Sequence, residues 1–431
     1  MKRPSPNTLY THDNLYVLCG LNSESVDLIY LDPPFNSKRT YSAPIGSKAA
    51  GASFKDMWTW QDVDEYYLDT LAVSFPALAK YIANSGEIHG KSMMAYLTFM
   101  AQRIIEMHRV LKKTGSLYLH CDPTASHYLK LLLDCVFGKN NFRNEIVWCY
   151  NIGGKSKKGF ANKHDTIYRY SKSGKYTFNA KETSVAMTPH KQDRSGKNYG
   201  GKMGVDEEGR QYVEKQGTRD KDGNYRYYRY YLEEGKILED WWIDINTIQP
   251  SSKERTGYPT QKPLALLKRI VLASSNEGDT VLDPFCGCAT TCVAAQQLQR
   301  KWIGIDIEKQ AVRVLVQRLS DAGRLFRDFV ATDQIPKRSD IKIVPPSSSV
   351  RERLYKEQDG KCNACRQDFE LRNLELDHII PKAKGGGDYY ENYQLLCGSC
   401  NRIKGDRPME YLRLKIETRE RMMKNKIFFG E

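Results

Sequence analysis

A chain of 431 residues is long enough for two or three domains that each bury their own core. Its 66 Lys and Arg residues outnumber its 52 Asp and Glu residues, so the net charge of +14 favours a polyanionic partner such as nucleic acid. No stretch of about 18 apolar residues occurs and the N-terminus lacks the apolar core of a secretion signal, which excludes a membrane-spanning or exported class. We therefore expect a cytoplasmic protein with no membrane partner.

The expected elements alternate in type along the chain. Residues 15–32 and 114–122 look like buried strands, and the segment 95–115 between them has helical periodicity. The same alternation returns near the end, where we expect helices at 263–275 and 289–300 and strands at 279–285 and 301–307. Alternation of this kind predicts a parallel sheet in an α/β fold.

Two segments interrupt this pattern. Residues 151–230 contain 18 Lys and Arg against 9 Asp and Glu, show little apolar periodicity and include the run YRYYRYY at 225–231. Residues 333–350 combine Pro-Pro with a serine run, which predicts a flexible linker because neither regular element continues through it. A small unit with four cysteines follows the linker.

The segment LDPPFN at 31–36 ends the first expected strand with an acid, two prolines and an aromatic ring. A nucleobase amine is a poor nucleophile until its lone pair is localised. The Asp32 carboxylate can accept a hydrogen bond from one N–H of this amine, and the carbonyl of Pro33 can accept one from the other N–H. Pro33 and Pro34 restrict the backbone that carries these acceptors. Phe35 would stack on a base flipped out of the duplex. The structural alternative is a strand that simply ends in a Pro-Pro turn.

Three further segments form a cofactor-type pattern. DPFCGCATT at 283–291 joins an expected strand to a helix with small residues, where a cofactor can approach the backbone closely. The strand WIGID then ends in Asp306, where an acid would bind ribose hydroxyls. TGYPTQKPLALLKRIV at 256–271 precedes both segments.

With these motifs in this order, residues 7–330 resemble the β class of amino-methylating DNA methyltransferases of the adenine-N6 type. The resemblance implies that Asp32, Pro33, Pro34 and Phe35 bind the amine and that the cofactor is S-adenosylmethionine. It places Asp13 near the cofactor adenine and Asp306 on the ribose, and it implies that residues 142–150 line the target-base pocket. The other residues that it assigns to the cofactor pocket are Thr260, Lys262, Pro263, Asp283, Phe285 and Gly287.

Two positions depart from the family pattern. Cys288 and Ala289 stand where the family most often has Ser or Gly and then Gly, so we expect the Ala289 Cβ to point toward the cofactor and weaken its binding. The Lys- and Tyr-rich span at 151–230 lies where the family keeps target recognition, so its charges would contact phosphates and its rings would stack on bases. A solvated insert is the alternative. Residues 38–95 either close over the target or form a packed surface subdomain.

Four cysteines in the tail form two CxxC pairs, whereas the other seven are scattered as reduced thiols would be. In a reduced compartment, two such pairs predict a closed, structural zinc site with four thiolate ligands, which would support a domain too small for a large core. The ligands would be Cys362, Cys365, Cys397 and Cys400.

Around these cysteines, LELDHIIPKAKGGGDYYENYQLL and CGSCN resemble the HNH nuclease family over residues 351–410. The resemblance implies that His378 is the general base, that Asp377 and Asn401 hold one Mg²⁺ ion, and that Asn392 orders the loop that aims the histidine. Oxygen ligands suit this hard cation, and imidazole titrates near neutrality. A zinc-stabilised DNA-binding fold without cleavage is the alternative.

We therefore expect an α/β fold with two enzymatic parts. The first is a Rossmann-like methyltransferase sheet with an inserted recognition domain, and the second is a small zinc-stabilised ββα-metal domain of the HNH type. The expected boundaries are 1–150 for the catalytic half, 151–245 for the insert, 246–332 for the cofactor-binding half, 333–350 for the linker and 351–431 for the nuclease domain.

The function expected from this organisation is adenine-N6 methylation of double-stranded DNA coupled to Mg²⁺-dependent cleavage, as in restriction and modification. Four alternatives stay open: a cytosine-N4 methyltransferase, a methyltransferase whose HNH unit only binds DNA, a methylation-sensing protein without catalysis, and an RNA methyltransferase. The oligomeric state also stays open, with a homodimer among the possibilities.

Overall fold

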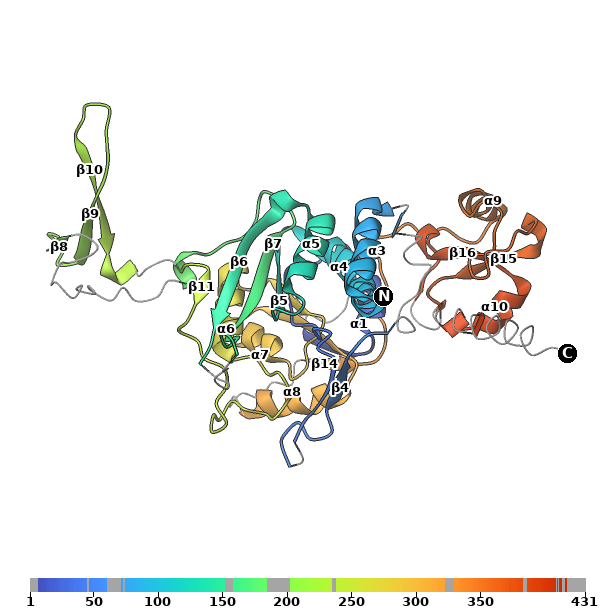
Figure 1. Cartoon of the computed structure of the whole chain (residues 1–431), viewed down its shortest axis with the longest axis horizontal. Helices are drawn as coiled ribbons and strands as arrows, with labels where there is room; N and C mark the ends of the chain where they lie inside the picture. The colour runs from blue at the N-terminus through green and yellow to red at the C-terminus, as the bar shows by residue number, and fades with distance from the viewer. Residues whose placement is uncertain are drawn as a thin grey trace.

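The computed structural model describes residues 7–44, 46–59, 71–72, 74–151, 158–183, 202–234, 238–321, 329–382, 386–407, 409, 411–412 and 415–416. Parts of the expected insert (152–157, 184–201 and 235–237) and the tail 417–431 lie outside the described residues. The chain forms a central α/β body, with a small sheet projecting from one side and a compact C-terminal domain on the other (Figure 1). Within the described part, no helix is both long and apolar enough to cross a bilayer.

The body is built on a sheet of nine described strands in the order β11-β6-β7-β5-β2-β12-β13-β1-β14. Every neighbouring pair is parallel except those made by β7, which runs antiparallel to β5 and β6, so the expectation of a purely parallel sheet is wrong at this strand. The strands are β1 (Asn7–Thr11), β2 (Val26–Leu31), β5 (Leu111–Cys121), β6 (Phe142–Cys149), β7 (His164–Ser171), β11 (Trp241–Trp242), β12 (Thr280–Asp283), β13 (Lys301–Asp306) and β14 (Val330–Thr332).

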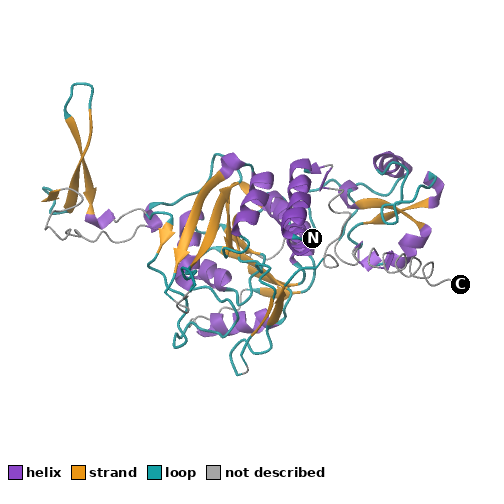
Figure 2. Cartoon of the chain, in the orientation of Figure 1, coloured by secondary structure: helices purple, strands orange, loops and turns teal. Residues whose placement is uncertain are grey.

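Helices cover both faces of this sheet (Figure 2). Along β2, Ile29 and Leu31 pack in a core with the helices of one face, whereas Leu28 and Tyr30 pack in the core of the other face, as the alternation of a strand requires. The helices that contribute side chains to the first core are α1 (Asn14–Gly20), α3 (Pro76–His89), α4 (Lys91–Val110) and α5 (Ser126–Phe137). Those that contribute to the second core are α6 (Leu264–Ser274), α7 (Thr290–Gln297) and α8 (Gln310–Asp321). Short 3-10 helices occur at Lys139–Asn141, Lys181–Thr183, Leu232–Glu234, Leu371–Asn373 and Tyr390–Asn392.

The first expected strand is too long at its N-terminal end. Residues 14–20 form α1, and the strand itself begins only at Val26. The helix has a good N-terminal cap, because the Asp13 carboxylate accepts a 2.8 Å hydrogen bond from the backbone N–H of Leu15. The capped helix satisfies backbone groups that a strand would need a neighbour to satisfy.

A hairpin follows the LDPPFN segment directly. It consists of β3 (Arg39–Ser42) and β4 (Ser53–Asp56), which pair in antiparallel fashion. The Asp56 carboxylate accepts hydrogen bonds from the backbone N–H groups of Asn36 and Ser37, at 2.6 and 3.1 Å. These bonds tie the end of the hairpin to the turn that carries the two prolines.

The projecting sheet is formed by β8 (Lys202–Val205), β9 (Gln211–Arg219) and β10 (Tyr225–Tyr231), in the order β10-β9-β8 (Figure 1). Two other strands of the expected insert, β7 and β11, belong to the main sheet. The part that leaves the body is therefore narrower than the range 151–245.

The C-terminal domain contains α9 (Ser348–Glu357), β15 (Leu374–His378), β16 (Tyr393–Cys397) and α10 (Gly398–Lys404), and it has a hydrophobic core of its own. The two strands form an antiparallel pair, and α10 continues from the end of β16. This is the ββα arrangement that the sequence predicts.

The linker before this domain is held at several points. The Ser339 N–H donates to Asn22 Oδ1 at 2.8 Å, and the Ser23 N–H donates to Asp340 Oδ2 at 2.9 Å, so the linker lies on the loop after α1. Its last residues are helical, because α9 begins at Ser348 with the Ser347 hydroxyl as its cap. The first helix of the C-terminal domain therefore begins within the range 333–350 expected for the linker.

Candidate active sites

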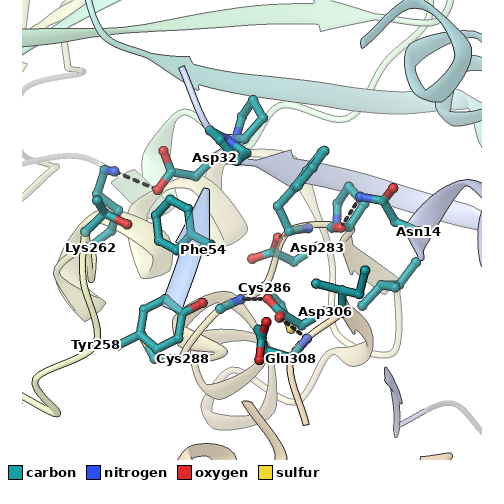
Figure 3. Close-up of a pocket in the computed structure, with 18 of the residues that line it drawn as sticks. Asn14, Asp32, Phe54, Tyr258, Lys262, Asp283, Cys286, Cys288, Asp306 and Glu308 are labelled. Atoms are coloured by element: carbon teal, nitrogen blue, oxygen red, sulfur yellow. Dashed lines mark hydrogen bonds and ion pairs between the residues drawn. The ribbon is translucent and has the colours of Figure 1, made fainter. Parts of the chain in front are cut away.

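A cavity of about 570 Å³ opens at the carboxyl ends of three neighbouring strands of the main sheet (Figure 3). Asp32 follows β2, Asp283 is the last residue of β12, and Asp306 is the last residue of β13. These acids meet because parallel strands end at the same edge of the sheet. The predicted site residues that line the cavity are Asp13, Asp32, Pro33, Pro34, Phe35, Thr260, Lys262, Asp283, Phe285, Gly287 and Asp306.

The two oxygens of the Asp32 carboxylate differ in their hydrogen bonding. Its Oδ2 atom accepts a 2.6 Å ion-pair hydrogen bond from Lys262 Nζ. Its Oδ1 atom is buried and has no hydrogen-bond partner among the residues that the structure describes. A buried acceptor of this kind is costly unless a donor reaches it, so it is suited to a ligand N–H.

Lys262 lines the cavity, whereas Pro263 does not. The Lys262 ammonium pairs with the Asp32 carboxylate and lies 5.7 Å from the centroid of the Phe35 ring. Pro263 is the N-cap residue of α6 and is not among the residues that line the cavity. The cofactor roles given to these two residues stay predictions.

The loop between β12 and α7 forms one wall of the cavity. Gly287 has a φ of +51°, and a Cβ added to it would lie 2.8 Å from the Tyr258 ring, so a larger residue does not fit there. Ala289 also has a positive φ, of 56°, but it is fully buried in the core beneath the sheet and does not line the cavity. The expectation that its Cβ points toward the cofactor is therefore wrong, whereas Cys288 does line the cavity.

Asp306 uses both carboxylate oxygens to hold the backbone of this wall. Oδ2 accepts from the Gly287 N–H and Oδ1 accepts from the Glu308 N–H, both at 2.8 Å. Burial raises the pKa of Asp306 to about 6 despite these two bonds. Glu308 lines the same cavity and was not predicted, although its position two residues after Asp306 is a signal that the sequence contains.

Asp13 lines the cavity from the start of α1, where it is the N-cap residue. It forms an ion pair with the Arg103 guanidinium at 3.0 Å, and the same guanidinium donates to Asn14 Oδ1 at 2.6 Å. The Asn14 amide in turn donates to the carbonyl of Pro284 at 2.7 Å. These bonds connect α1 to the residue after Asp283 and so fix the position of Asp13.

A chain of polar side chains lies beside Asp32, and of its members only Tyr150 belongs to a segment, 142–150, that the sequence places at the target-base pocket. The Tyr30 hydroxyl is 2.9 Å from His120 Nδ1, His120 Nε2 is 3.0 Å from Asp165 Oδ2, and the Tyr150 hydroxyl donates to Asp165 Oδ1 at 3.0 Å. Tyr30, Tyr150 and Asp165 line the cavity, whereas His120 is fully buried. Burial raises the pKa of Asp165, but the hydrogen bond and charge of His120 outweigh that effect, so its pKa lies below the usual value.

The buried Asp283 carboxyl makes the body pH-sensitive. Burial, with smaller effects from Asp32 and Asp306, raises its pKa to about 7, although hydrogen bonds from Thr291 and the Phe285 N–H oppose the rise. An unfolded chain has an Asp pKa of about 3.9, so the folded state binds this proton more tightly. The stabilisation from this group is complete below about pH 4 and is lost as the pH rises through about 7.

We therefore expect Asp283→Asn to stabilise the protein relative to the wild type as the pH rises. The gain should grow by at most about 1.4 kcal/mol per pH unit between pH 5 and 7, because the variant has no proton to lose there. Denaturant unfolding of both proteins across this range measures the gain. A stability difference that does not change with pH would contradict the assignment.

The cysteines of the two CxxC pairs meet in the C-terminal domain. Their Sγ atoms all lie within 4.8 Å of one another, and tetrahedral Zn–S bonds of about 2.3 Å would place the sulfurs about 3.8 Å apart. In the described part of the chain, they are the only group of three or more His, Cys, Asp or Glu residues close enough to share a metal ion. The Cys397 N–H also donates to Cys362 Sγ at 3.2 Å, so the donor set fits zinc.

His378 ends β15 and pairs with an acid that was not predicted. Its Nε2 atom lies 2.9 Å from Asp388 Oδ1, and its ring packs on Tyr393 with the centroids 4.9 Å apart. Asp388 also accepts from Lys382 Nζ at 2.8 Å and from the Tyr393 hydroxyl at 3.0 Å. The bond from Lys382, followed by that from His378, lowers the pKa of Asp388 to about 2, so this carboxylate stays charged.

The two predicted Mg²⁺ ligands already have protein partners. Asp377 pairs with the buried Lys404 ammonium at 3.0 Å and accepts from the Gln394 amide at 2.8 Å. The Asn401 amide donates to Glu375 Oε2 at 2.6 Å. Glu375 and Asp377 lie on the same face of β15, so their oxygens and the Asn401 amide gather between β15 and α10.

Asn392 lies in the loop between the two strands of this domain. Its Oδ1 atom accepts from the Ile380 N–H at 2.8 Å, and its amide donates to the carbonyls of Ile380 and Gly387, both at 3.1 Å. These bonds close the loop that carries Asp388.

Comparison with known proteins identifies both parts of the chain. Residues 26–317 match the model of the N6/N4 DNA methylase family, and residues 362–407 match that of the HNH endonuclease family. The type II methyltransferase M.EcaI of Enterobacter cloacae is 30% identical over 375 residues, which cover 78% of this chain and 74% of that protein. The DNA adenine methyltransferase YhdJ of Escherichia coli is 27% identical over 347 residues, which cover 79% of this chain and 93% of that protein. The chain therefore belongs to the DNA methylase family and carries an additional C-terminal HNH domain.

Proposed function

We propose that the methylase part transfers a methyl group from S-adenosylmethionine to the N6 amine of adenine in duplex DNA. The observation that supports this most strongly is the free, buried Asp32 Oδ1 beside Phe35. One amine N–H would donate to this oxygen and the other to the carbonyl of Pro33, while the ring stacks on Phe35. The prolines preorganise both acceptors, so little rearrangement is needed when the base enters.

The same cavity offers a fitting place for the cofactor. Its wall contains the Gly287 backbone, the Tyr258 ring and the acids Asp306 and Glu308, which suit the close approach and the hydroxyls of a nucleoside. When bound, S-adenosylmethionine supplies an activated methyl group. The residues of the chain align the amine with that group and exclude water, which are the contributions that methyl transfer needs from a protein.

Adenine is favoured over cytosine as the target. Both bases present an exocyclic amine with two donors, so Asp32 and Pro33 alone do not separate them. The relative YhdJ is named a DNA adenine methyltransferase and matches most of this chain, which supports adenine-N6 here. Cytosine-N4 is the alternative that the base mapping below distinguishes.

The residues that would contact DNA phosphates lie mainly in the first part of the insert. Residues 202–234, which include the projecting sheet, contain 7 Lys and Arg against 8 Asp and Glu, so the basic excess lies between 151 and 201. On the projecting sheet, the rings of Tyr225, Tyr227, Tyr228 and Tyr230 are exposed. This sheet is suited to stacking on bases rather than to binding phosphate.

The HNH domain is proposed to cleave DNA with His378 as general base. Because Asp388 is a charged acceptor, His378 Nε2 carries the proton that it donates, and Nδ1 is left free to take a proton from water. Oxygen atoms of Asp377 and Asn401 would hold Mg²⁺, which stabilises negative charge on a phosphate when bound. The four cysteines would hold a structural zinc ion.

One observation favours an HNH domain that binds DNA without cutting it. The Lys404 ammonium forms an ion pair with the Asp377 carboxylate, so a metal ion must compete with a buried cation for that ligand. If cleavage does occur, the fusion supports a restriction-modification role in which methylation protects the sites that the nuclease would cut.

A single experiment on the wild-type protein tests this proposal. Plasmid and linear DNA are incubated with S-adenosylmethionine, with Mg²⁺, with both or with neither, and modified bases and breaks are then mapped by sequencing. We expect N6-methyladenine within one short recurrent sequence, and breaks only when Mg²⁺ is present. Methylcytosine would overturn the choice of base, and intact DNA with Mg²⁺ would leave the HNH domain as a DNA-binding unit.

A further inference from the structure

We propose that Lys262 belongs to the target-amine site rather than to the cofactor site, as a positioning residue for Asp32. This inference rests on the proposed methylation function, in which Asp32 accepts the amine. The Lys262 ammonium holds one oxygen of the Asp32 carboxylate and thereby directs the other oxygen toward the base. The TQKP motif then serves the reacting amine, although the sequence resemblance assigns it to the cofactor.

The contact that supports this is short and largely buried. Lys262 Nζ lies 2.6 Å from Asp32 Oδ2, and the exposed fractions of the two side chains are 10% and 15% (Figure 3). The same ammonium lies 5.7 Å from the centroid of the Phe35 ring, on which the base would stack. The ammonium therefore lies beside both groups proposed to bind the base, the Asp32 carboxylate and the Phe35 ring.

A charged carboxylate at this depth needs a compensating partner. The pairing with Lys262 compensates the loss of water around Asp32, yet it engages only Oδ2 and leaves Oδ1 without a partner among the described residues. A carboxylate held at one oxygen cannot rotate freely about its last bond. The free oxygen thus keeps one direction before the base arrives, which is the preorganisation that catalysis requires.

The residues around Lys262 fix its backbone. Pro263 restricts the residue before it to extended conformations and begins α6, which explains a motif proline that does not line the cavity. The Gln261 side chain accepts hydrogen bonds from the Thr256 N–H and hydroxyl at 2.8 and 2.7 Å and donates to the Glu254 carbonyl at 2.9 Å. Gln261 and Pro263, on either side of Lys262, thus fix the backbone that carries the ammonium group.

The test separates the amine site from the cofactor site. Lys262→Met should lower kcat at saturating cofactor by about 10²-fold, as expected for a misplaced acceptor, while the Kd for S-adenosylmethionine changes less than about 3-fold. Lys262→Arg keeps the charge and should recover part of the loss in kcat. Lys268→Met is the matched control, because Lys268 lies on α6 outside the cavity-lining residues, and it should leave both quantities unchanged.

The double variant Asp32→Asn with Lys262→Met guards against misfolding, because it removes both buried charges together. Its Kd for S-adenosylmethionine, measured by calorimetry, should match that of the wild type. The inference would be overturned if the Kd rose more than about 10-fold in this variant and in Lys262→Met while Lys262→Met kept its kcat at saturating cofactor. Lys262 would then be assigned to the cofactor site. A wild-type protein that incorporates no methyl group would instead refute the proposed function.

Discussion

Replacing Asp32 with alanine is expected to lower the rate of methyl transfer by about 10³-fold while S-adenosylmethionine still binds. The substitution removes the oxygen that would accept the amine N–H and leaves the Lys262 ammonium without its 2.6 Å partner. A buried charge that loses its partner costs about 3 to 5 kcal/mol of stability, so the variant should also melt at a lower temperature. Rates are therefore compared below the melting temperature, with labelled cofactor and mapped target DNA.

The chain offers a matched control for this loss. Asp27 lies at the other end of β2 and forms its own ion pair with Lys112 at 2.8 Å, far from the cavity. Asp27→Ala should lower stability without the loss in rate. If Asp32→Ala keeps more than about a tenth of the wild-type rate, Asp32 is not the amine acceptor.

Replacing His378 with alanine is expected to lower DNA cleavage by about 10²- to 10⁴-fold and to leave methylation unchanged. The general base is lost, whereas none of the described residues that line the methylase cavity belongs to the HNH domain. Counting single- and double-strand breaks in plasmid with Mg²⁺ measures the first effect, and methyl incorporation by the same sample measures the second.

Two further variants make the second prediction specific. Asp388→Asn removes the charge that orients His378, so cleavage should fall by less than in His378→Ala. His127→Ala changes an exposed histidine on α5 and should alter neither activity. Breaks that continue at the wild-type rate in His378→Ala would show that another group activates the water.

Elements with a strong local signal follow the sequence closely. The helix expected at 263–275 and the strand expected at 301–307 occur as α6 and β13, within a residue of the expected bounds. The acids at the strand ends were found for the same reason, because each follows a short apolar run, and Asp32 and Asp283 also precede proline. The cluster of four cysteines was predicted correctly because two CxxC pairs constrain which side chains can share an ion.

Elements that depend on distant partners were not found. Residues 15–20 are apolar enough for a strand, and only the Asp13 cap and the packing of α1 on α4 make them a helix. The antiparallel entry of β7 next to β5 has no local signature, yet it alone brings Asp165 to His120. The Ala289 side chain points into the core because of how α7 packs, which the composition of the loop does not reveal.

The sequence by itself determined that the chain combines a DNA methylase part with an HNH domain, because the motifs that carry each resemblance are short runs of neighbouring residues. Only the tertiary structure decided how those groups are oriented. The pair of Lys262 with Asp32 joins residues 230 positions apart, and the bonds of His378 with Asp388 and of Asp377 with Lys404 depend on how loops and helices return to a strand end. Hydrophobic periodicity records only which face of a segment is buried, so it cannot specify which distant polar group that segment will meet.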